Sequence, residues 1–258
     1  MNGFHYIERF IEDRVGVVKL NRPKQLNALN RQMVREIITA LEEFDQNDEV
    51  GTILLTGNGR AFSAGADIDE MAGTDSIQME LLNQFADWDR ITLIKKPIIG
   101  AVKGFVFGGG FELALSLDLL IAARGTQFSF PEVQLGVMPG AGGTQRLTKI
   151  VGRAKALEWI WTGDRIPAET ALENGIINRI VSEEILMEES MKLAKRLANQ
   201  PPLSLRLIKD SVNKAVDYTL YEGMQYERKN FYLLFSSQDQ KEGMQAFIEK
   251  RKAEFQGK

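Results

Sequence analysis

The segment PIIGAVKGFVFGGGFELALSLD, residues 97–118, decides the expected fold. It opens with an apolar run from Pro97 to Val102 that has the length and composition of a buried β-strand. Three consecutive glycines follow at 108–110, and an apolar helical segment containing Glu112 comes directly after them. A strand, a glycine turn and a helix in succession indicate an α/β protein with crossover connections.

The flanking sequence repeats this alternation. Residues 4–20 contain two β-like runs separated by a polar turn, which predicts a hairpin. Apolar residues spaced by three and four predict a helix over 30–47, with Asn30 as its cap, and TILLT at 52–56 reads as a buried strand. A further helix is expected around 79–94 and a strand at 118–123, so the first two thirds of the chain favour the α/β class.

The last third of the chain is expected to be mostly helical. From about Ala141 onward helical patterns dominate, with helices expected over 186–199, 203–216 and 218–234. We therefore divide the chain into a core, residues 1–195, and a C-terminal helical region, residues 196–258, that belongs to the same functional unit.

Composition narrows the functional class. The 258 residues carry a net charge of −3, which offers no global basic field for nucleic acid, and no apolar run approaches the length of a membrane span. The absence of cysteine excludes disulfides and thiolate chemistry and fits a cytoplasmic location. The single histidine, His5, makes a Ser-His-Asp triad or a multi-histidine zinc site improbable, and a surface strand position is expected for it.

Two junctions of small residues stand out, at 62–67 (FSAGAD) and 108–112 (GGGFE). Neither a phosphate-binding loop, nor a dinucleotide fingerprint, nor a nucleophile elbow accompanies them. Small residues let a ligand approach the backbone, and free N–H groups at a helix start favour an anion, so two such junctions together would form an oxyanion hole. Considered singly, each junction is better explained as a tight turn.

Glu112 and Glu132 are the candidate acid and base. Each stands near the start of a helical segment, where the helix dipole alone would favour a glutamate. If they face one pocket, one can take a proton from water while the other delivers a proton to carbon. Burial would have to raise a pKa for the acid to work near neutrality, and sequence spacing does not show that the two residues meet.

Five segments in order resemble motifs of the enoyl-CoA hydratase/isomerase (crotonase) family. The segments are NRPKQLNAL at 21–29, FSAGADIDEM at 62–71, the opening segment at 97–118, FSFPEVQLGVMPGAGGTQRL at 128–147 and EGMQAFIEKRKAEF at 242–255. They cover almost the whole chain. The resemblance implies a spiral of ββα turns in the core, followed by a helical trimerisation region that forms homotrimers or dimers of trimers (homohexamers).

The resemblance is greatest to enoyl-CoA hydratases, carbon–oxygen lyases of fatty-acid or related acyl-CoA degradation. It implies that Ala66 and Gly109 supply the oxyanion-hole N–H groups, with Glu112 as base toward water and Glu132 as proton donor. CoA would be part of the substrate, with no separate cofactor, metal, nucleic-acid or membrane partner. The further substrate contacts implied are Ala64, Asp67, Ile68 and, for the CoA phosphates, Lys24.

Other functions remain open from the sequence. An enoyl-CoA isomerase of the same family is the second candidate, although two retained glutamates favour the hydratase. A non-catalytic CoA- or RNA-binding scaffold is the third, and its best basic segment is the short stretch Lys250-Arg251-Lys252. Residues 73–84 are expected to form part of the acyl pocket, whereas Trp88 is expected in the core or at an interface. The preferred acyl chain and the product stereochemistry are not predicted.

Overall fold

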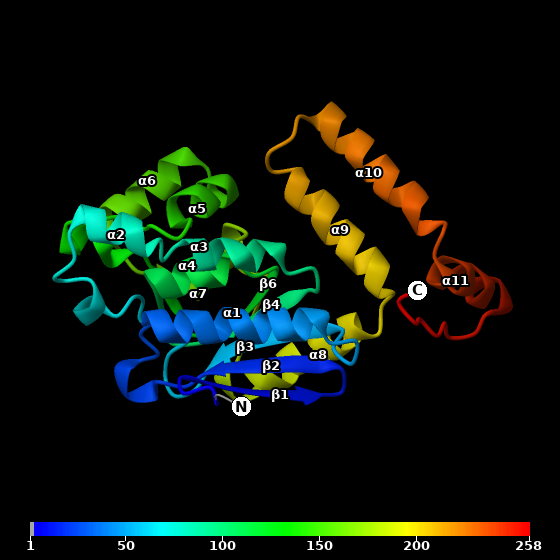
Figure 1. The fold of residues 1–258 in the computed structure, drawn as a ribbon, viewed down its shortest axis with the longest axis horizontal. Helices are drawn as coiled ribbons and strands as arrows, with labels where there is room; N and C mark the ends of the chain where they lie inside the picture. The colour runs from blue at the N-terminus through cyan, green and yellow to red at the C-terminus, as the bar shows by residue number, and fades with distance from the viewer. Residues whose placement is uncertain (1–2) are drawn as a thin grey trace.

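A computed structural model describes residues 3–258 and confirms the α/β class (Figure 1). Its centre is a six-stranded sheet in the order β1-β2-β3-β4-β6-β9. β1 and β2 are antiparallel, as expected for the N-terminal hairpin, and the other neighbours are parallel. The strands are β1 (Ile7–Glu12), β2 (Val15–Leu20), β3 (Thr52–Gly57), β4 (Ile98–Val102), β6 (Leu119–Ala123) and β9 (Arg179–Val181).

A second sheet has three strands, which are interspersed along the chain with the later strands of the first sheet. Its strands are β5 (Phe105–Phe107), β7 (Gln127–Ser129) and β8 (Ile166–Pro167), and β7 pairs with both others. A parallel bridge joins Ser63 to Val106, and another joins Leu29 to Ala66. These bridges attach the 62–67 junction to the small sheet on one side and to the start of α1 (Arg31–Gln46) on the other.

Helices cover both faces of the main sheet. On one face lies α1, whose predicted cap is confirmed because the Asn30 side chain accepts a hydrogen bond from Met33 N. α8 (Leu186–Ala198) packs on the opposite face, where Leu186 and Ala194 join a separate apolar cluster with strand residues. The sheet is therefore buried on both sides, which explains why its inner strands read as nearly continuous apolar runs.

The single helix expected around 79–94 is wrong. The chain instead forms α2 (Ser76–Leu82), α3 (Ala86–Asp89) and a 3-10 turn, η3 (Arg90–Leu93). Asn83 ends α2 in the left-handed conformation, with φ of 41°, which asparagine tolerates better than most residues. This break divides the expected helix into three short elements.

The remaining short helices and 3-10 turns lie in the segments that link the elements already named. They are α4 (Gly109–Leu115), α5 (Gly143–Val151), α6 (Arg153–Thr162), α7 (Ala168–Glu173) and the 3-10 turns η1 (Pro23–Gln25), η2 (Ile68–Glu70), η4 (Pro131–Leu135) and η5 (Glu183–Ile185).

The C-terminal region extends away from the sheet (Figure 1). Its helices are α9 (Pro202–Lys214), α10 (Leu220–Leu234) and α11 (Gln238–Glu249), so the expected helical pattern is confirmed with shifted bounds. Lys209 of α9 donates to the carboxylate of Asp118 at the start of β6, at 2.7 Å, and ties this region to the sheet. α10 buries none of its residues, and Leu220 on it is 82% exposed.

No helix within residues 3–258 combines the length and the apolar character that a membrane crossing requires.

Candidate active site

The two small-residue junctions pack against each other backbone to backbone. Gly65 and Gly108 both have positive φ, 109° and 49°, and a Cβ added to Gly108 would lie 3.6 Å from Gly65 Cα. A Cβ on Gly110 would come within 2.6 Å of Ser63 Cβ and 2.7 Å of Ser63 O. The glycines are therefore needed because side chains would separate the junctions.

This packing brings two free amides together. Leu29 donates to Gly65 O at 2.7 Å and accepts from Asp67 N at 2.9 Å, so the N–H of Ala66, between them, points the other way. Gly109 is the first residue of α4, and a Cβ added to it would lie 3.5 Å from Ala66 N. Within residues 3–258 neither N–H has a hydrogen-bond acceptor, and both residues line one cavity. The pair has the geometry of an oxyanion hole.

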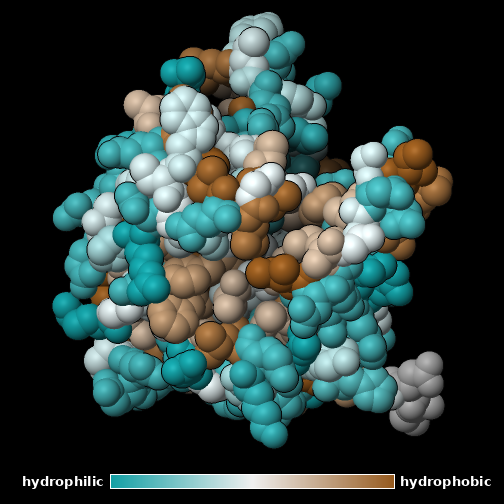
Figure 2. All heavy atoms as spheres, turned by 90° about the vertical axis from the view of Figure 1, so that its left-hand side faces the viewer, coloured by the Kyte–Doolittle hydropathy of each residue, from teal (hydrophilic) through white to brown (hydrophobic). Residues whose placement is uncertain are grey.

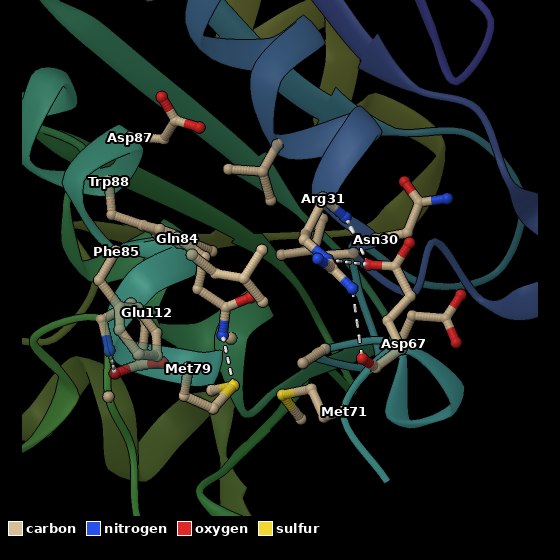
Figure 3. Close-up of a pocket in the computed structure, with 18 of the residues that line it drawn as sticks. Asn30, Arg31, Asp67, Met71, Met79, Gln84, Phe85, Asp87, Trp88 and Glu112 are labelled. Carbon is tan, nitrogen blue, oxygen red and sulfur yellow. Dashed lines mark hydrogen bonds and ion pairs between the residues drawn. The ribbon is translucent and has the colours of Figure 1, made fainter. Parts of the chain in front are cut away.

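The cavity has a volume of about 580 Å³. Figure 3 shows Glu112 with Phe85 and Trp88 on one side, and Arg31 and Asp67 on the opposite side. The segment from Met71 to Trp88 supplies much of the apolar wall, and several residues of the stretch 73–84 line the cavity, while their contact with an acyl chain stays a prediction. Its lining residues there are Met71, Thr74, Met79, Leu82, Gln84, Phe85, Asp87 and Trp88.

The outer face of the same segment is also apolar. α2 leaves Ile77 and Leu81 exposed to 68% and 80%. Figure 2, which turns this side of the molecule to the viewer, shows apolar residues gathered in the middle of the face and hydrophilic residues around them.

Glu112 is held at the inner end of the cavity. It is only 4% exposed, and its Oε1 accepts hydrogen bonds from Ala141 N at 2.7 Å and Gly143 N at 2.8 Å. Burial raises the pKa of Glu112, while these amides and the positive charge of Arg146 oppose the rise. The hydrogen bonds of this carboxylate within the described chain fall on Oε1, so Oε2 can hold a water molecule.

Glu132 lies in η4, directly after Pro131, and reaches toward the glycine turn. Its Oε1 is 3.0 Å from the position that a Cβ of Gly108 would occupy, so this glycine makes room for the carboxyl group. Among the described residues no partner bonds to its buried Oε2. Burial, together with the nearby charge of Glu112, raises the pKa of Glu132 to about 7.

Five sequence-derived residues therefore meet at one cavity: Ala66, Asp67, Gly109, Glu112 and Glu132. The Asp67 carboxylate also accepts a hydrogen bond from Arg22 at 2.9 Å. The other three lie outside the cavity wall. Lys24 is exposed in η1, Ile68 is exposed in η2, and Ala64 is partly exposed, so their contacts with CoA stay predictions.

Sequence reasoning missed several cavity residues. Trp88 packs against the core, as expected, and it also lines the cavity. Arg31 enters from the first turn of α1, and Arg146 supports the loop behind Glu112. Arg146 stands within the family-like segment 128–147, which is the signal that could have marked it. In the part of the chain described, no cluster of three metal-ligating side chains occurs.

Fold and site together define an α/β protein with a two-amide anion site and two buried carboxylates beside an apolar cavity. The family model described as enoyl-CoA hydratase/isomerase matches residues 11–258, and the chain belongs to this family. It therefore has the family's spiral fold, with the helical region at its C-terminal end.

Named relatives agree with this assignment. The chain is 45% identical over 244 residues to a "Probable enoyl-CoA hydratase" of Rhizobium meliloti, covering 95% of each protein. It is also 45% identical over 255 residues to "Enoyl-CoA hydratase, mitochondrial" of Pongo abelii, covering 98% of this chain and 88% of that one. A crystal structure of an enoyl-CoA hydratase subunit I from Geobacillus kaustophilus superimposes with a TM-score of 0.97 at 65% identity, over 99% of both chains.

Proposed function

We propose that the chain is an enoyl-CoA hydratase that adds water across the 2,3 double bond of a trans-2-enoyl-CoA to give a 3-hydroxyacyl-CoA. The observation that carries the proposal is the pairing of Glu112 and Glu132 beside two free amides in one cavity. Relatives named as enoyl-CoA hydratases, similar over nearly their whole length, support the same reaction. The enzyme is then a carbon–oxygen lyase of acyl-CoA degradation.

The thioester oxygen would bind between Ala66 N and Gly109 N. As the nucleophile adds to C3, negative charge moves to this oxygen, and two fixed N–H donors stabilise the charge without reorganising. The acyl chain then lies along the apolar wall formed by residues 71–88. CoA is part of the substrate, and we propose no separate cofactor, because the residues proposed for catalysis all belong to this chain.

The two glutamates have different surroundings, which suits them to different roles. Two amides hold Glu112 and favour its ionised form, so it takes a proton from the water as the water oxygen bonds to C3. Glu132, with a pKa of about 7, donates its proton to C2. The proton left on Glu112 returns to Glu132 through the next bound water, which restores both groups for another turnover.

The enoyl-CoA isomerase is the second candidate, because the same amide pair would stabilise a dienolate. Moving a proton between two carbons requires a single carboxyl group. The presence of two carboxyl groups that flank the site for water favours hydration.

Binding of RNA finds little support in the basic segment near the C-terminus. Arg251 is bound to Glu242 at 2.6 Å and to Glu249 at 2.6 Å, so its charge is neutralised within the chain. Lys250 ends α11 in a left-handed conformation, and no array of basic and aromatic residues follows it.

The deciding experiment follows the loss of the ultraviolet absorbance of crotonyl-CoA, with Glu112→Gln and Glu132→Gln measured beside the unchanged protein. Each variant should lose about 100-fold to 10,000-fold in turnover while it still binds a saturated acyl-CoA. Glu158→Gln, an exposed carboxylate on α6, serves as the matched control and should keep full activity. Conversion of a 3-enoyl-CoA without hydration of crotonyl-CoA would identify the isomerase instead.

We also propose that the protein assembles as a homotrimer or a dimer of trimers in the cytoplasm. Large apolar side chains on α10 and α11 support an interface in this region, with Tyr221 72%, Phe247 86% and Ile248 73% exposed. Light scattering on the purified protein should give a mass three or six times that of the 29.0 kDa chain. A monomer would contradict the proposal.

A further inference from the structure

The carboxylate of Glu112 depends on a short loop for its position. Residues 139–142 lead into α5, and the amides of Ala141 and Gly143 both point at Glu112 Oε1. Gly143 is the first residue of α5, so its N–H has no partner inside the helix and carries the positive end of the helix dipole. The position of this loop therefore determines whether both amides reach Glu112 Oε1.

Arg146 fixes that loop from the other side. Its backbone N donates to Gly142 O at 2.9 Å, and its guanidinium Nη1 donates to Ala141 O at 3.0 Å. The guanidinium lies against Gly142, where an added Cβ would come within 2.1 Å of Nη1. Gly142 has φ of 102°, so a glycine there both permits the turn and leaves room for the arginine.

Placing the guanidinium of Arg146 in this partly buried position costs free energy of desolvation. Burial lowers the pKa of Arg146, and the negative charges of Glu112 and Asp89 oppose that decrease. In residues 3–258 no carboxylate forms an ion pair with it, so its charge acts on Glu112 across the loop. A partly buried cation without a direct partner is retained at a cost in desolvation.

We propose that Arg146 is a positioning residue for the catalytic base: it holds the 141–143 loop so that two amides meet Glu112 Oε1, and its charge keeps that carboxylate ionised. This inference rests on the proposed function, since it assigns Glu112 the role of base. The charged groups around Glu112 are Arg146 from α5, Glu132 from η4 and, beyond Arg146, Asp89 from α3. Of these, Arg146 alone favours a charged Glu112.

The test compares Arg146→Gln and Arg146→Lys with the unchanged protein over a range of pH. Removing the cation raises the pKa of Glu112, so the acidic limb of the kcat profile should move upward by about one pH unit in Arg146→Gln. Its turnover relative to the unchanged protein should then be about tenfold lower at acidic pH than at pH 8, with KM nearly unchanged. Arg146→Lys keeps a cation and should restore much of the acidic limb. Arg153→Gln, an exposed cation at the start of α6, is the control and should leave the profile in place.

A purely structural role would give a different result. Lower turnover at every pH together with a lower melting temperature, and no shift of the acidic limb, would overturn the proposal. So would a fully active Arg146→Gln. The carboxyl titration of Glu112, followed by carbon-13 NMR and assigned with Glu112→Gln, does not depend on activity. An upward shift of that titration in Arg146→Gln supports the effect on ionisation even if crotonyl-CoA is not hydrated, whereas an unmoved titration refutes it.

Discussion

The substitution Gly109→Ala should disturb the oxyanion hole and leave the supporting fold intact. The added Cβ would lie 3.5 Å from Ala66 N and 3.8 Å from Leu29 Cδ1, distances of ordinary van der Waals contact. The fold therefore accommodates the methyl group. The same methyl rests against Ala66 N, the atom to which the thioester oxygen must also hydrogen-bond, so the oxygen is displaced from its place between the two N–H groups.

The expected effects on activity and stability have opposite signs. Loss of one oxyanion donor elsewhere costs about 100-fold to 1,000-fold in kcat, or about 2.7–4 kcal/mol in transition-state stabilisation, and we expect a loss in this range. Alanine favours a helix over glycine by up to about 1 kcal/mol, and position 109 begins α4. The melting temperature of Gly109→Ala should therefore be unchanged or slightly higher.

The assay combines the hydration of crotonyl-CoA, calorimetric binding of butyryl-CoA and thermal melting followed by circular dichroism. Butyryl-CoA has no double bond to hydrate and reports ground-state binding, which should change far less than kcat. Gly110→Ala is the contrasting variant, because its Cβ would collide with Ser63, and it should lose on the order of 1–3 kcal/mol of stability. Turnover of Gly109→Ala within threefold of the unchanged protein, with the fold intact, would refute the assignment of this amide.

Four further predictions concern the side chains of Glu132, Ser190 and Asp67. If Glu132 donates the proton, kcat/KM should fall about tenfold for each pH unit above about 7, and a flat profile up to pH 9 would contradict this role. The folded protein binds the Glu132 proton more tightly than the unfolded chain, so this group lowers stability as pH rises from 4.5 to about 7. Glu132→Gln should therefore raise the melting temperature at pH 8 more than at pH 5, which a pair of thermal melts checks. The hydroxyl of Ser190 is buried without a partner among the described residues, so in chemical denaturation Ser190→Ala should leave the free energy of unfolding unchanged or raise it. Asp67→Asn weakens the contact with Arg22 that ties two loops beside Ala66, and should reduce kcat several-fold in the hydration assay while the melting temperature falls by only a few degrees.

The parts of the fold that could be predicted are those with strong local signals. Within residues 97–118, the strand β4 and the helix α4 were predicted correctly because a buried strand and an apolar helix after glycines each have a distinct composition, whereas β5 between them was missed. The three residues of β9 were missed because so short a strand, within a helix-rich region, has no measurable periodicity. The break at Asn83 was missed because the apolar residues on either side of it still fit one helical pattern.

The functional site could be predicted only in part, because it depends on contacts between distant segments of the chain. Sequence marked Ala66, Gly109, Glu112 and Glu132 as candidates, mainly through the family resemblance, but spacing alone gave no reason for them to meet. Their meeting depends on the bridge between Ser63 and Val106 and on the pairing of β5 with β7, which are contacts between distant segments. Apart from its place in the family-like segment 128–147, Arg146 had no local feature that distinguished it from an exposed helical arginine, and its position behind the 141–143 loop reveals its use.

The two glutamates illustrate how one cavity produces an acid and a base from the same side chain. Burial raises the pKa of both carboxyl groups. Glu112 receives two amides and the field of Arg146, which oppose burial, whereas the buried Oε2 of Glu132 receives no hydrogen bond from the described chain. An ionised Glu112 then raises the pKa of Glu132 further, so each group favours the opposite protonation state of the other. The glycines at 108 and 142 leave room for the carboxyl group of Glu132 and the guanidinium of Arg146, so the difference between acid and base originates in the backbone of the two loops.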